Sequence, residues 1–420
     1  MEKIKSLRGF RDIYGDEVIR FRLIEDISRR YLELFGYKEI IIPVLENTGL
    51  FVRTIGDATD IVEKEMFTFT DTGGDSVTLR PEATAGMVRA YLETGMFAKE
   101  RISKLFSIGP MFRHERPQKG RYREFRQVDV EVFGIEAPII DAELIWMIYL
   151  ILKSIGLAEY TIETNSVGCP ECREGFKRLI VGYFEDKKQD LCEDCRRRLQ
   201  KNPLRIFDCK SPGCKEISGS SPLLFDNLCD PCRVHFDGFL SHTEELNIPI
   251  TVNKRLVRGL DYYTRTVFEV TSGGLGSQNA FLAGGRYDNL VQSMGGPPVP
   301  GIGFAIGVDR LSLLISTSVK KDGSTVFLAY LGDRAKGFIV PMMRLFTENN
   351  VKFFYLPDAK SLKSQMRYAD SVGADTVLII GDDEIDKGIL IVRDMAHSSQ
   401  TTLPLDLTNL IDNLKGLSKK

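Results

Sequence analysis

The charge pattern of residues 112–126 is the clearest sign of chemistry in this chain. The stretch holds six basic side chains against two acidic ones, and its proline and glycine predict a loop. Arg113 stands near its start. Gln127, Asp129 and Glu131 follow it at a spacing of two, which places their side chains on one face of a strand. A guanidinium group beside carboxylates suits a substrate that carries phosphates and an amine. Without these flanking strands, the loop would be an ordinary solvated hairpin.

A second stretch combines an arginine with two aromatic residues. The alternation of residues 253–263 predicts a strand, in which Arg258 would be buried close to Tyr262 and Tyr263. Aromatic pairs usually belong to the core, but a buried charge needs a partner. The combination therefore favours a binding site.

Two shorter stretches are weaker signals when taken alone. Glu82 and Thr84 follow Pro81, a pattern that by itself predicts only the start of a helix over residues 82–92. Residues 301–315 predict a glycine-rich strand that runs into a helix containing Arg310. The glycine spacing there does not fit a dinucleotide-binding loop.

All eight cysteines lie within one short part of the chain. Paired short spacings of this kind are typical of tetrahedral zinc sites, and two four-cysteine sites would use every thiol. The sequence leaves open which pairs combine. It also leaves open a reduced module without metal, and an iron–sulfur cluster fits the spacing less well. The candidate ligands are Cys169, Cys172, Cys192, Cys195, Cys209, Cys214, Cys229 and Cys232.

The elements that must position these residues follow from periodicity. Long strands are predicted over residues 104–113 and 127–134, on either side of the basic loop. Further elements are predicted as helices over residues 18–35 and 141–155, a strand over 39–44, a hairpin over 66–70 and 75–79, and a strand over 267–271. From residue 325, strands at 326–330, 351–355, 376–380 and 389–392 alternate with helices, and a helix over 407–414 closes a small α/β domain. Residues 318–324 predict a polar linker.

Composition sets the remaining limits. A chain of 420 residues suggests two or three domains, and a net charge of −2 means that any polyanion must be met by local basic patches. No apolar run approaches a membrane span, and the first residues do not resemble a signal peptide. We therefore expect a cytoplasmic protein with no membrane partner, in which disulfides are disfavoured.

Several of these stretches resemble the histidyl-tRNA synthetase family of class II aminoacyl-tRNA synthetases. Phe112-Arg113-His114-Glu115 and the basic loop resemble the family's motif 2, and residues 301–310 resemble motif 3. The run from Leu256 to Tyr263 resembles a signature particular to the histidine-specific members. Ala83 departs mildly from the pattern, since the family usually has glycine there.

The resemblance implies an α+β fold with three parts. These are an antiparallel-sheet class II catalytic core over residues 1–168 and 243–318, a cysteine-rich insertion over 169–242, and a C-terminal α/β anticodon-binding domain over 325–420. It also implies a homodimer, with residues 40–43 at the interface. Most relatives lack the cysteines, so the resemblance does not imply the metal.

The implied activity is the ATP-dependent ligation of histidine to its tRNA through a histidyl-adenylate, with magnesium accompanying ATP. The resemblance assigns catalysis to Arg113 and Arg258, and ATP binding to Arg113, Glu115 and Arg310. It assigns histidine binding to Glu82, Thr84, Gln127, Glu131, Tyr262, Tyr263 and Tyr287. It assigns contacts with the tRNA acceptor end to Arg116, Gln118, Arg121 and Arg123.

Two other functions must be weighed against this one. The first is a non-catalytic, synthetase-like regulatory subunit of ATP phosphoribosyltransferase, which lacks the anticodon-binding domain and usually has degraded motifs. The second is a zinc-dependent RNA-binding protein with an inactive site. The intact arginines and the C-terminal α/β pattern favour the enzyme. We expect structural roles for the chain's four histidines, His114, His235, His242 and His397.

Overall fold

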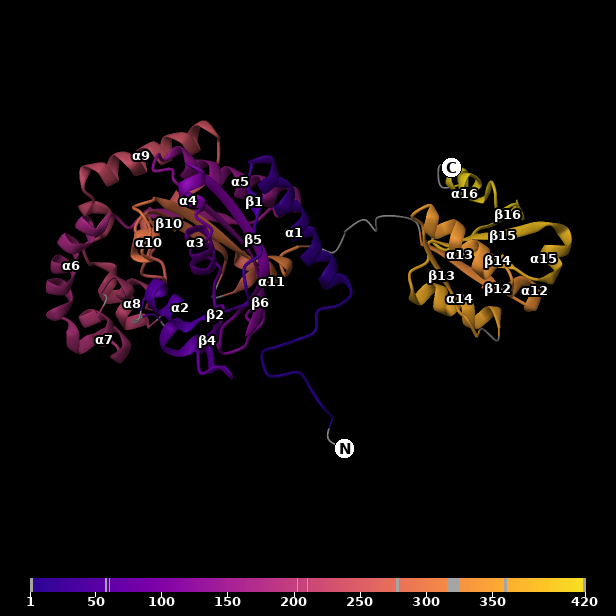
Figure 1. The fold of residues 1–420 in the computed structure, drawn as a ribbon, viewed down its shortest axis with the longest axis horizontal. Coiled ribbons are helices and arrows are strands. Elements are labelled where there is room, and N and C mark those ends of the chain that lie inside the picture. Colours follow the sequence, from indigo (N-terminus) through magenta and orange to yellow (C-terminus); the bar gives the residue numbers. More distant parts are fainter. Residues whose placement is uncertain are drawn as a thin grey trace. The chain divides into compact units, whose positions relative to one another are not determined.

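The computed structural model divides into two compact units, Met1–Thr317 and Ser318–Lys420 (Figure 1). It describes residues 3–56, 59, 61–201, 203–209, 211–276, 279–315, 325–358 and 361–417. The predicted linker over residues 318–324 lies outside this description. Within the described ranges, no helix is both long and apolar enough to cross a membrane.

An eight-stranded sheet forms the centre of the first unit, with the strand order β1-β5-β6-β11-β10-β9-β7-β8. Its inner neighbours pair antiparallel, and only the two edge pairs, β1–β5 and β7–β8, are parallel. This confirms the predicted antiparallel core. The strands are β1 (Lys38–Glu39), β5 (Ser103–Phe112), β6 (Glu124–Phe133), β7 (Thr161–Ser166), β8 (Ile250–Val252), β9 (Thr264–Thr271), β10 (Ala280–Arg286) and β11 (Gly301–Gly307).

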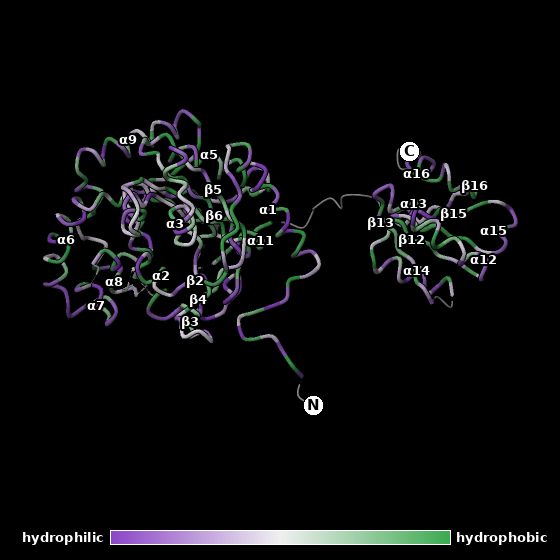
Figure 2. Tube along the Cα trace, in the orientation of Figure 1, coloured by the Kyte–Doolittle hydropathy of each residue, from purple (hydrophilic) through white to green (hydrophobic). Residues whose placement is uncertain are grey.

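The two faces of strand β6 have different chemistry. Val128, Val130 and Val132 point into a hydrophobic core with helices α1 (Asp16–Leu34) and α5 (Ile139–Ile155). Alternation therefore turns the intervening polar residues toward the opposite face. Figure 2 shows the hydrophobic colouring concentrated along the central strands and α5.

A three-stranded sheet, β2-β4-β3, lies beside the main sheet and includes the predicted hairpin. The predicted strand over residues 39–44 is wrong beyond residue 39. Arg80 explains this, because its Nη1 donates to the carbonyl oxygens of Ile42 (2.8 Å) and Pro43 (3.3 Å), which a strand partner would otherwise use. The strands of this small sheet are β2 (Leu45–Asn47), β3 (Phe67–Thr70) and β4 (Ser76–Leu79). Other helices of the first unit are α2 (Thr48–Ile55), α3 (Thr84–Glu93), α4 (Met96–Lys99), α10 (Leu290–Ser293) and α11 (Val308–Ser312).

The cysteines lie in a group of helices that follows β7 and precedes β8 in the chain. Cysteine side chains and aliphatic residues of these helices share one hydrophobic core, and this core extends to Leu256, Tyr263 and Val267 of the catalytic part. The helices are α6 (Pro170–Glu185), α7 (Glu193–Lys201), α8 (Pro212–Gly219) and α9 (Asp230–Glu245) (Figure 1).

Residues 253–263 do not form the predicted strand. They follow β8 as an irregular segment, and regular structure returns only at β9. Leu260, Tyr262 and Tyr263 both line the cavity and pack against the core of the cysteine-bearing helices. Contacts with those helices hold the segment where a strand partner would otherwise be needed.

The second unit contains a five-stranded sheet in the order β13-β12-β14-β15-β16. β12 lies parallel to both β13 and β14, whereas β15 and β16 add antiparallel. The fifth strand, β16, was not predicted, because its residues are largely exposed and carry little apolar pattern. The elements are β12 (Thr325–Tyr330), β13 (Lys352–Tyr355), β14 (Thr376–Ile380), β15 (Ile389–Asp394), β16 (Gln400–Pro404), α12 (Asp333–Lys336), α13 (Ile339–Glu348), α14 (Leu362–Ser371), α15 (Asp382–Lys387) and α16 (Leu410–Leu417).

Candidate active site

A cavity of about 460 Å³ lies over the face of the main sheet that carries the polar residues of β6. Its volume suits a small organic ligand. Eleven of the residues predicted from the sequence line it, and they come from segments far apart in the chain: Glu82, Thr84, Arg113, Glu115, Arg121, Gln127, Arg258, Tyr262, Tyr263, Tyr287 and Arg310.

Glu131 is buried directly behind two residues that line this cavity, Thr84 and Tyr287, and is not itself part of the lining. It accepts a hydrogen bond from Thr84 (2.6 Å) and another from the hydroxyl of Tyr287. Burial raises the pKa of Glu131 to about 8, against the lowering effect of these two bonds. Gly303 makes room for the carboxylate, because a Cβ at that position would collide with it.

Two further buried carboxylates share this part of the cavity. Burial raises the pKa of Glu82 and, well above its usual value, that of Asp129, to which the negative charge of Glu82 adds. Among the described residues, Oε2 of Glu82 and Oδ2 of Asp129 have no hydrogen-bond partner. Buried acceptors with raised pKa values are prepared for a ligand that brings hydrogen-bond donors or positive charge.

Tyrosine rings form the wall next to these carboxylates. The ring centroids of Tyr262 and Tyr263 are 4.8 Å apart, and those of Tyr262 and Tyr287 are 5.7 Å apart. Burial raises the pKa of all three hydroxyls, so they stay protonated and can donate. This wall can hold a flat polar ring.

Arginines lie across the rest of the cavity. Nε of Arg113 donates to the carbonyl oxygen of Pro81 (2.8 Å), which fixes its guanidinium over the end of β5. Arg258 pairs with Glu269, and its guanidinium carbon lies 5.9 Å from the ring centroid of Tyr263. Burial lowers the pKa of Arg310, and the nearby positive charge of Arg121 adds to this. Three guanidinium groups around one cavity suit a polyphosphate.

The loop between β5 and β6 carries the residues predicted to contact the tRNA, and only Arg121 among them lines the cavity. Arg121 donates to Oε2 of Glu115 (2.7 Å) at the cavity, and the backbones of Gln118 and Arg121 bond to each other at the tip. Arg116 and Gln118 are exposed, and Arg123 packs against the N-terminal segment, with its backbone N–H on the carbonyl oxygen of Gly9. None of these last three lines the cavity.

Two residues of the cavity were given no specific role in the site predicted from sequence. Asp129 was placed on one face with Gln127 and Glu131, and it lines the cavity beside Gln127. Glu269 lines the cavity and pairs with Arg258, but only the fold brings these two residues together. The described lining contains no histidine, in keeping with the structural roles expected for them.

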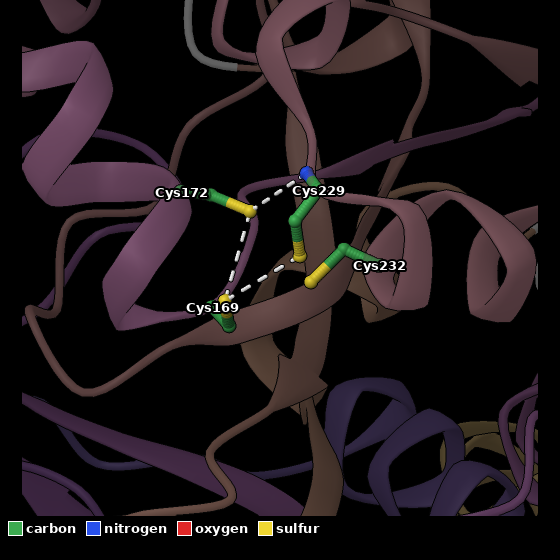
Figure 3. A group of neighbouring side chains, drawn as sticks. All are labelled: Cys169, Cys172, Cys229 and Cys232. Carbon is green, nitrogen blue, oxygen red and sulfur yellow. Dashed lines mark hydrogen bonds between the residues drawn. The ribbon is translucent and has the colours of Figure 1, made fainter.

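The eight cysteines gather into two groups of four. Cys169, Cys172, Cys229 and Cys232 form the first, and in each group all sulfur atoms lie within 4.8 Å of one another (Figure 3). In the first group, Sγ of Cys169 is 3.6 Å from that of Cys172 and 3.8 Å from that of Cys229. The second group consists of Cys192, Cys195, Cys209 and Cys214.

These sulfur distances restrict what the groups can hold. A disulfide requires about 2 Å between sulfurs, so the thiols are not oxidised pairs. Four thiolates at about 2.3 Å from one tetrahedral ion stand about 3.8 Å apart, close to the distances between these sulfurs. Several irons would need more room between the thiolates, so both groups fit a single ion.

Comparison with known proteins gives one consistent result. The family model described as histidyl-tRNA synthetase matches residues 9–171 and 234–311, and the model described as anticodon binding domain matches residues 325–417. The histidine–tRNA ligase of Geobacter sulfurreducens is 46% identical over 402 residues, covering 96% of this chain and 97% of the relative. That of Thermodesulfovibrio yellowstonii is also 46% identical, covering 95% of each chain.

Solved structures agree with these relatives. The crystal structure of apo Staphylococcus aureus histidyl-tRNA synthetase matches with a TM-score of 0.81 and 32% identity, covering 98% of this chain and 99% of that one. A Bacillus halodurans structure titled as an ATP phosphoribosyltransferase regulatory subunit/histidyl-tRNA synthetase has a TM-score of 0.65 at 20% identity, over 91% of this chain and 99% of that one. This second likeness shows the fold alone.

Proposed function

The chain belongs to the histidyl-tRNA synthetase family, and from this premise we propose how its residues carry out the ATP-dependent ligation of histidine to tRNA. The observation that carries the proposal is the cavity itself, in which three arginines lie across from a cluster of buried carboxylates and tyrosines. One side suits a triphosphate and the other suits an amino acid with a polar ring. The regulatory-subunit alternative is not favoured, since residues 325–417 match the anticodon binding domain and the full-length relatives are ligases.

Histidine would bind at the carboxylate side of the cavity. Its ammonium group would lie by Glu82 and Thr84, where Oε2 of Glu82 is buried and has no hydrogen-bond partner among the described residues. Its imidazole would meet Glu131, Gln127 and the three tyrosines. Analogues with an apolar side chain would leave these buried groups unpaired, which makes rejection strong.

ATP would bind at the arginine side. Arg113 would hold the α-phosphate, Arg310 the γ-phosphate and Glu115 the adenine. Magnesium would arrive on the phosphates and supply positive charge there, and the carboxylate of Glu269 offers the kind of oxygen donor that it prefers.

The first chemical step is then an in-line displacement. A carboxylate oxygen of histidine attacks the α-phosphorus, a new oxygen–phosphorus bond forms, and the bond to pyrophosphate breaks. Arg258 would lie between the reacting carboxylate and the α-phosphate. With Arg113 it would offset the growing negative charge. No side-chain nucleophile is required.

In the second step a hydroxyl of the terminal tRNA ribose attacks the acyl carbon and AMP leaves. Arg116, Gln118, Arg121 and Arg123 would contact the acceptor end from the loop beside the cavity. The second unit would bind the anticodon, as the name of its family model indicates. We place the catalytic part at residues 1–168 and 243–318, the insertion at 169–242 and the anticodon-binding domain at 325–420.

We further propose that the chain forms a homodimer through residues 40–43. Ile41 is 90% exposed next to the edge strand β1, an unusual position for a large aliphatic side chain. Sedimentation of an Ile41→Asp variant tests this. A monomer is expected, and an unchanged dimer would place the interface elsewhere.

The cysteine groups are proposed to hold one structural zinc ion each. Four thiolates in tetrahedral spacing are a donor set that zinc prefers, and a closed set of four leaves no position for substrate. Zinc would therefore stabilise the insertion and take no part in the reaction.

Histidine-dependent exchange of pyrophosphate into ATP tests the activity most simply, because it does not need tRNA. We expect exchange with histidine and none with the other amino acids at equal concentration. Intact, folded protein that shows no exchange would refute the proposed function.

A further inference from the structure

The segment that carries the histidine-binding tyrosines has no regular structure of its own. Residues 253–263 lie between β8 and β9. Tyr263 nevertheless belongs to the same hydrophobic core as the cysteine-bearing helices. The position of its ring in the cavity therefore depends on what those helices do.

The backbone immediately before Cys169 is hydrogen-bonded to Arg265, which lies two residues after this segment in the chain. The N–H of Arg265 donates to the carbonyl oxygen of Gly168 (2.9 Å), and the N–H of Val167 donates to the carbonyl oxygen of Arg265 (2.8 Å). Gly168 has φ of +64°, and a Cβ there would lie 2.6 Å from Cβ of Cys172. Glycine thus allows the chain to pass close to the thiols while bonding to residue 265.

Arg173 makes a second link between the group and the segment. It follows Cys172 on α6, its Nε donates to the carbonyl oxygen of Val167 (3.2 Å), and its Nη1 donates to that of Asp261 (3.4 Å). Asp261 directly precedes the two tyrosines. One guanidinium group therefore joins the helix that carries Cys172 to the backbone that carries the histidine pocket.

The first group also fixes the starting points of two helices. Cys169 and Cys229 are the N-cap residues of α6 and α9, and the backbone N–H of Cys229 donates to Sγ of Cys172 (3.1 Å). Helix α9 packs on α5, in the core beneath the main sheet. An ion that ties these two helix starts together would hold α6, and with it Arg173, against the catalytic part.

The second group lies differently with respect to the segment. Through helix α8 it reaches Arg255, which donates to the carbonyl oxygens of Ser218 and Gly219 at the opposite end of the segment from the tyrosines. Leu204 and Arg205, which precede Cys209 in the chain, also line a small cavity together with Asp261 and Tyr263. The two groups are therefore chemically alike but connect to the segment differently, the first through the bonds of Gly168 and Arg173 and the second through α8 and residues 204–205.

We propose that zinc bound by Cys169, Cys172, Cys229 and Cys232 positions the histidine-binding tyrosines, through Gly168 and Arg173. The second zinc site mainly stabilises the insertion. This inference rests on the proposed function for the identity of the ligand in the pocket. Arg173 is a positioning residue, since it contacts the backbone beside the pocket and lies outside the cavity lining.

The test compares Arg173→Ala with Arg178→Ala in the full-length protein. Arg178 lies on the same helix and is exposed, so it is a matched control. Zinc content is measured by mass spectrometry, and KM values for histidine and ATP are measured by pyrophosphate exchange. We expect two zinc ions per chain in every protein. For Arg173→Ala, we expect a KM for histidine raised about tenfold, since two ordinary hydrogen bonds are lost, with the KM for ATP changed less than about twofold.

Partial rescue is expected with Arg173→Lys, which keeps the charge and can make one of the two bonds. A merely structural role of Arg173 would raise both KM values or lower the amount of folded protein without separating histidine from ATP. An unchanged KM for histidine, or an equal rise in both KM values, would overturn the inference.

The metal is tested separately with Cys229→Ser and Cys192→Ser. Each variant is expected to lose one of the two zinc ions, and only Cys229→Ser is expected to raise the KM for histidine. If the purified protein carries no metal, or a metal other than zinc, the inference is overturned. The proposed function would then still be tested by pyrophosphate exchange. Absence of exchange in the wild type would refute the function, while the zinc count would still test the metal sites.

Discussion

The catalytic cavity and the cysteine-bearing insertion are built in opposite ways. The floor of the cavity is formed by strands whose other face packs on α1 and α5. The insertion consists of helices around a small core in which thiols take positions that aliphatic side chains would otherwise fill. The floor of the cavity therefore takes its rigidity from the sheet, whereas the insertion needs its bound ions.

The comparisons with known proteins divide along the same line. The synthetase model matches residues 9–171 and 234–311, which include every residue that we place in the cavity, and leaves out residues 172–233. Three of the four ligands of the first cysteine group and all of the second are outside or at the edge of the matched ranges. The residues of the cavity therefore lie within the ranges that the family model matches, and seven of the eight cysteines lie outside them.

The largest expected effect comes from removing a charge at the reacting atoms. Arg258→Ala should lower the rate of histidine-dependent exchange by about a thousandfold, the size found when a donor to transition-state charge is removed. The zinc content and the melting temperature should stay close to those of the wild type. Exchange activity within tenfold of the wild type would show that Arg258 does not have the role that we assign to it.

The next largest effect is expected from removing zinc, which should unfold the insertion and leave the main sheet folded. Removing zinc with a chelator should expose α6 to α9 to proteolysis and hydrogen exchange, because each site contributes on the order of 10 kcal/mol to folding. Peptides from β5, β6 and β11 should stay protected. Equal loss of protection in both regions would show that the insertion and the sheet fold as one unit.

These two regions also differ in how far the sequence could predict them. The alternation of Gln127, Asp129 and Glu131 was enough to place them on one face, because a strand has a fixed period. The same argument failed for residues 253–263, which form no strand because the segment packs between the cavity and the cysteine-bearing helices. The partnership of Arg258 with Glu269 could not be predicted either, since it depends on how β9 lies in the sheet. For the cysteines, spacing predicted the donor set, but only the fold shows that Cys169 and Cys172 join Cys229 and Cys232.

A smaller effect should appear in the pH dependence of stability. Glu131 has a pKa of about 8 in the folded chain, well above its usual value, because it is buried. The folded state therefore holds a proton that the unfolded state releases, and stability falls as pH rises from about 4.5 to 8, by at most about 1.4 kcal/mol per pH unit. Glu131→Gln should flatten this fall in melting curves of the ligand-free protein. Identical slopes in both proteins would show that Glu131 is ionised in the folded state.

The smallest effect should come from the exposed loop. Arg116→Ala should lower kcat/KM for tRNA by several-fold and reduce the salt dependence of charging by about one phosphate contact. Exchange should fall far less, because Arg116 does not line the cavity. A parallel loss in both reactions would place Arg116 at the substrates of the first step.

Charging of tRNA by the full-length protein tests the central claim most directly. Purified protein is incubated with ATP, magnesium, labelled histidine and bacterial tRNA, and the label bound to tRNA is measured before and after mild base. We expect ATP-dependent, base-labile attachment of histidine, absent with Arg258→Ala and unaffected by an excess of the other amino acids. No attachment by protein that is folded and carries its zinc would contradict the account.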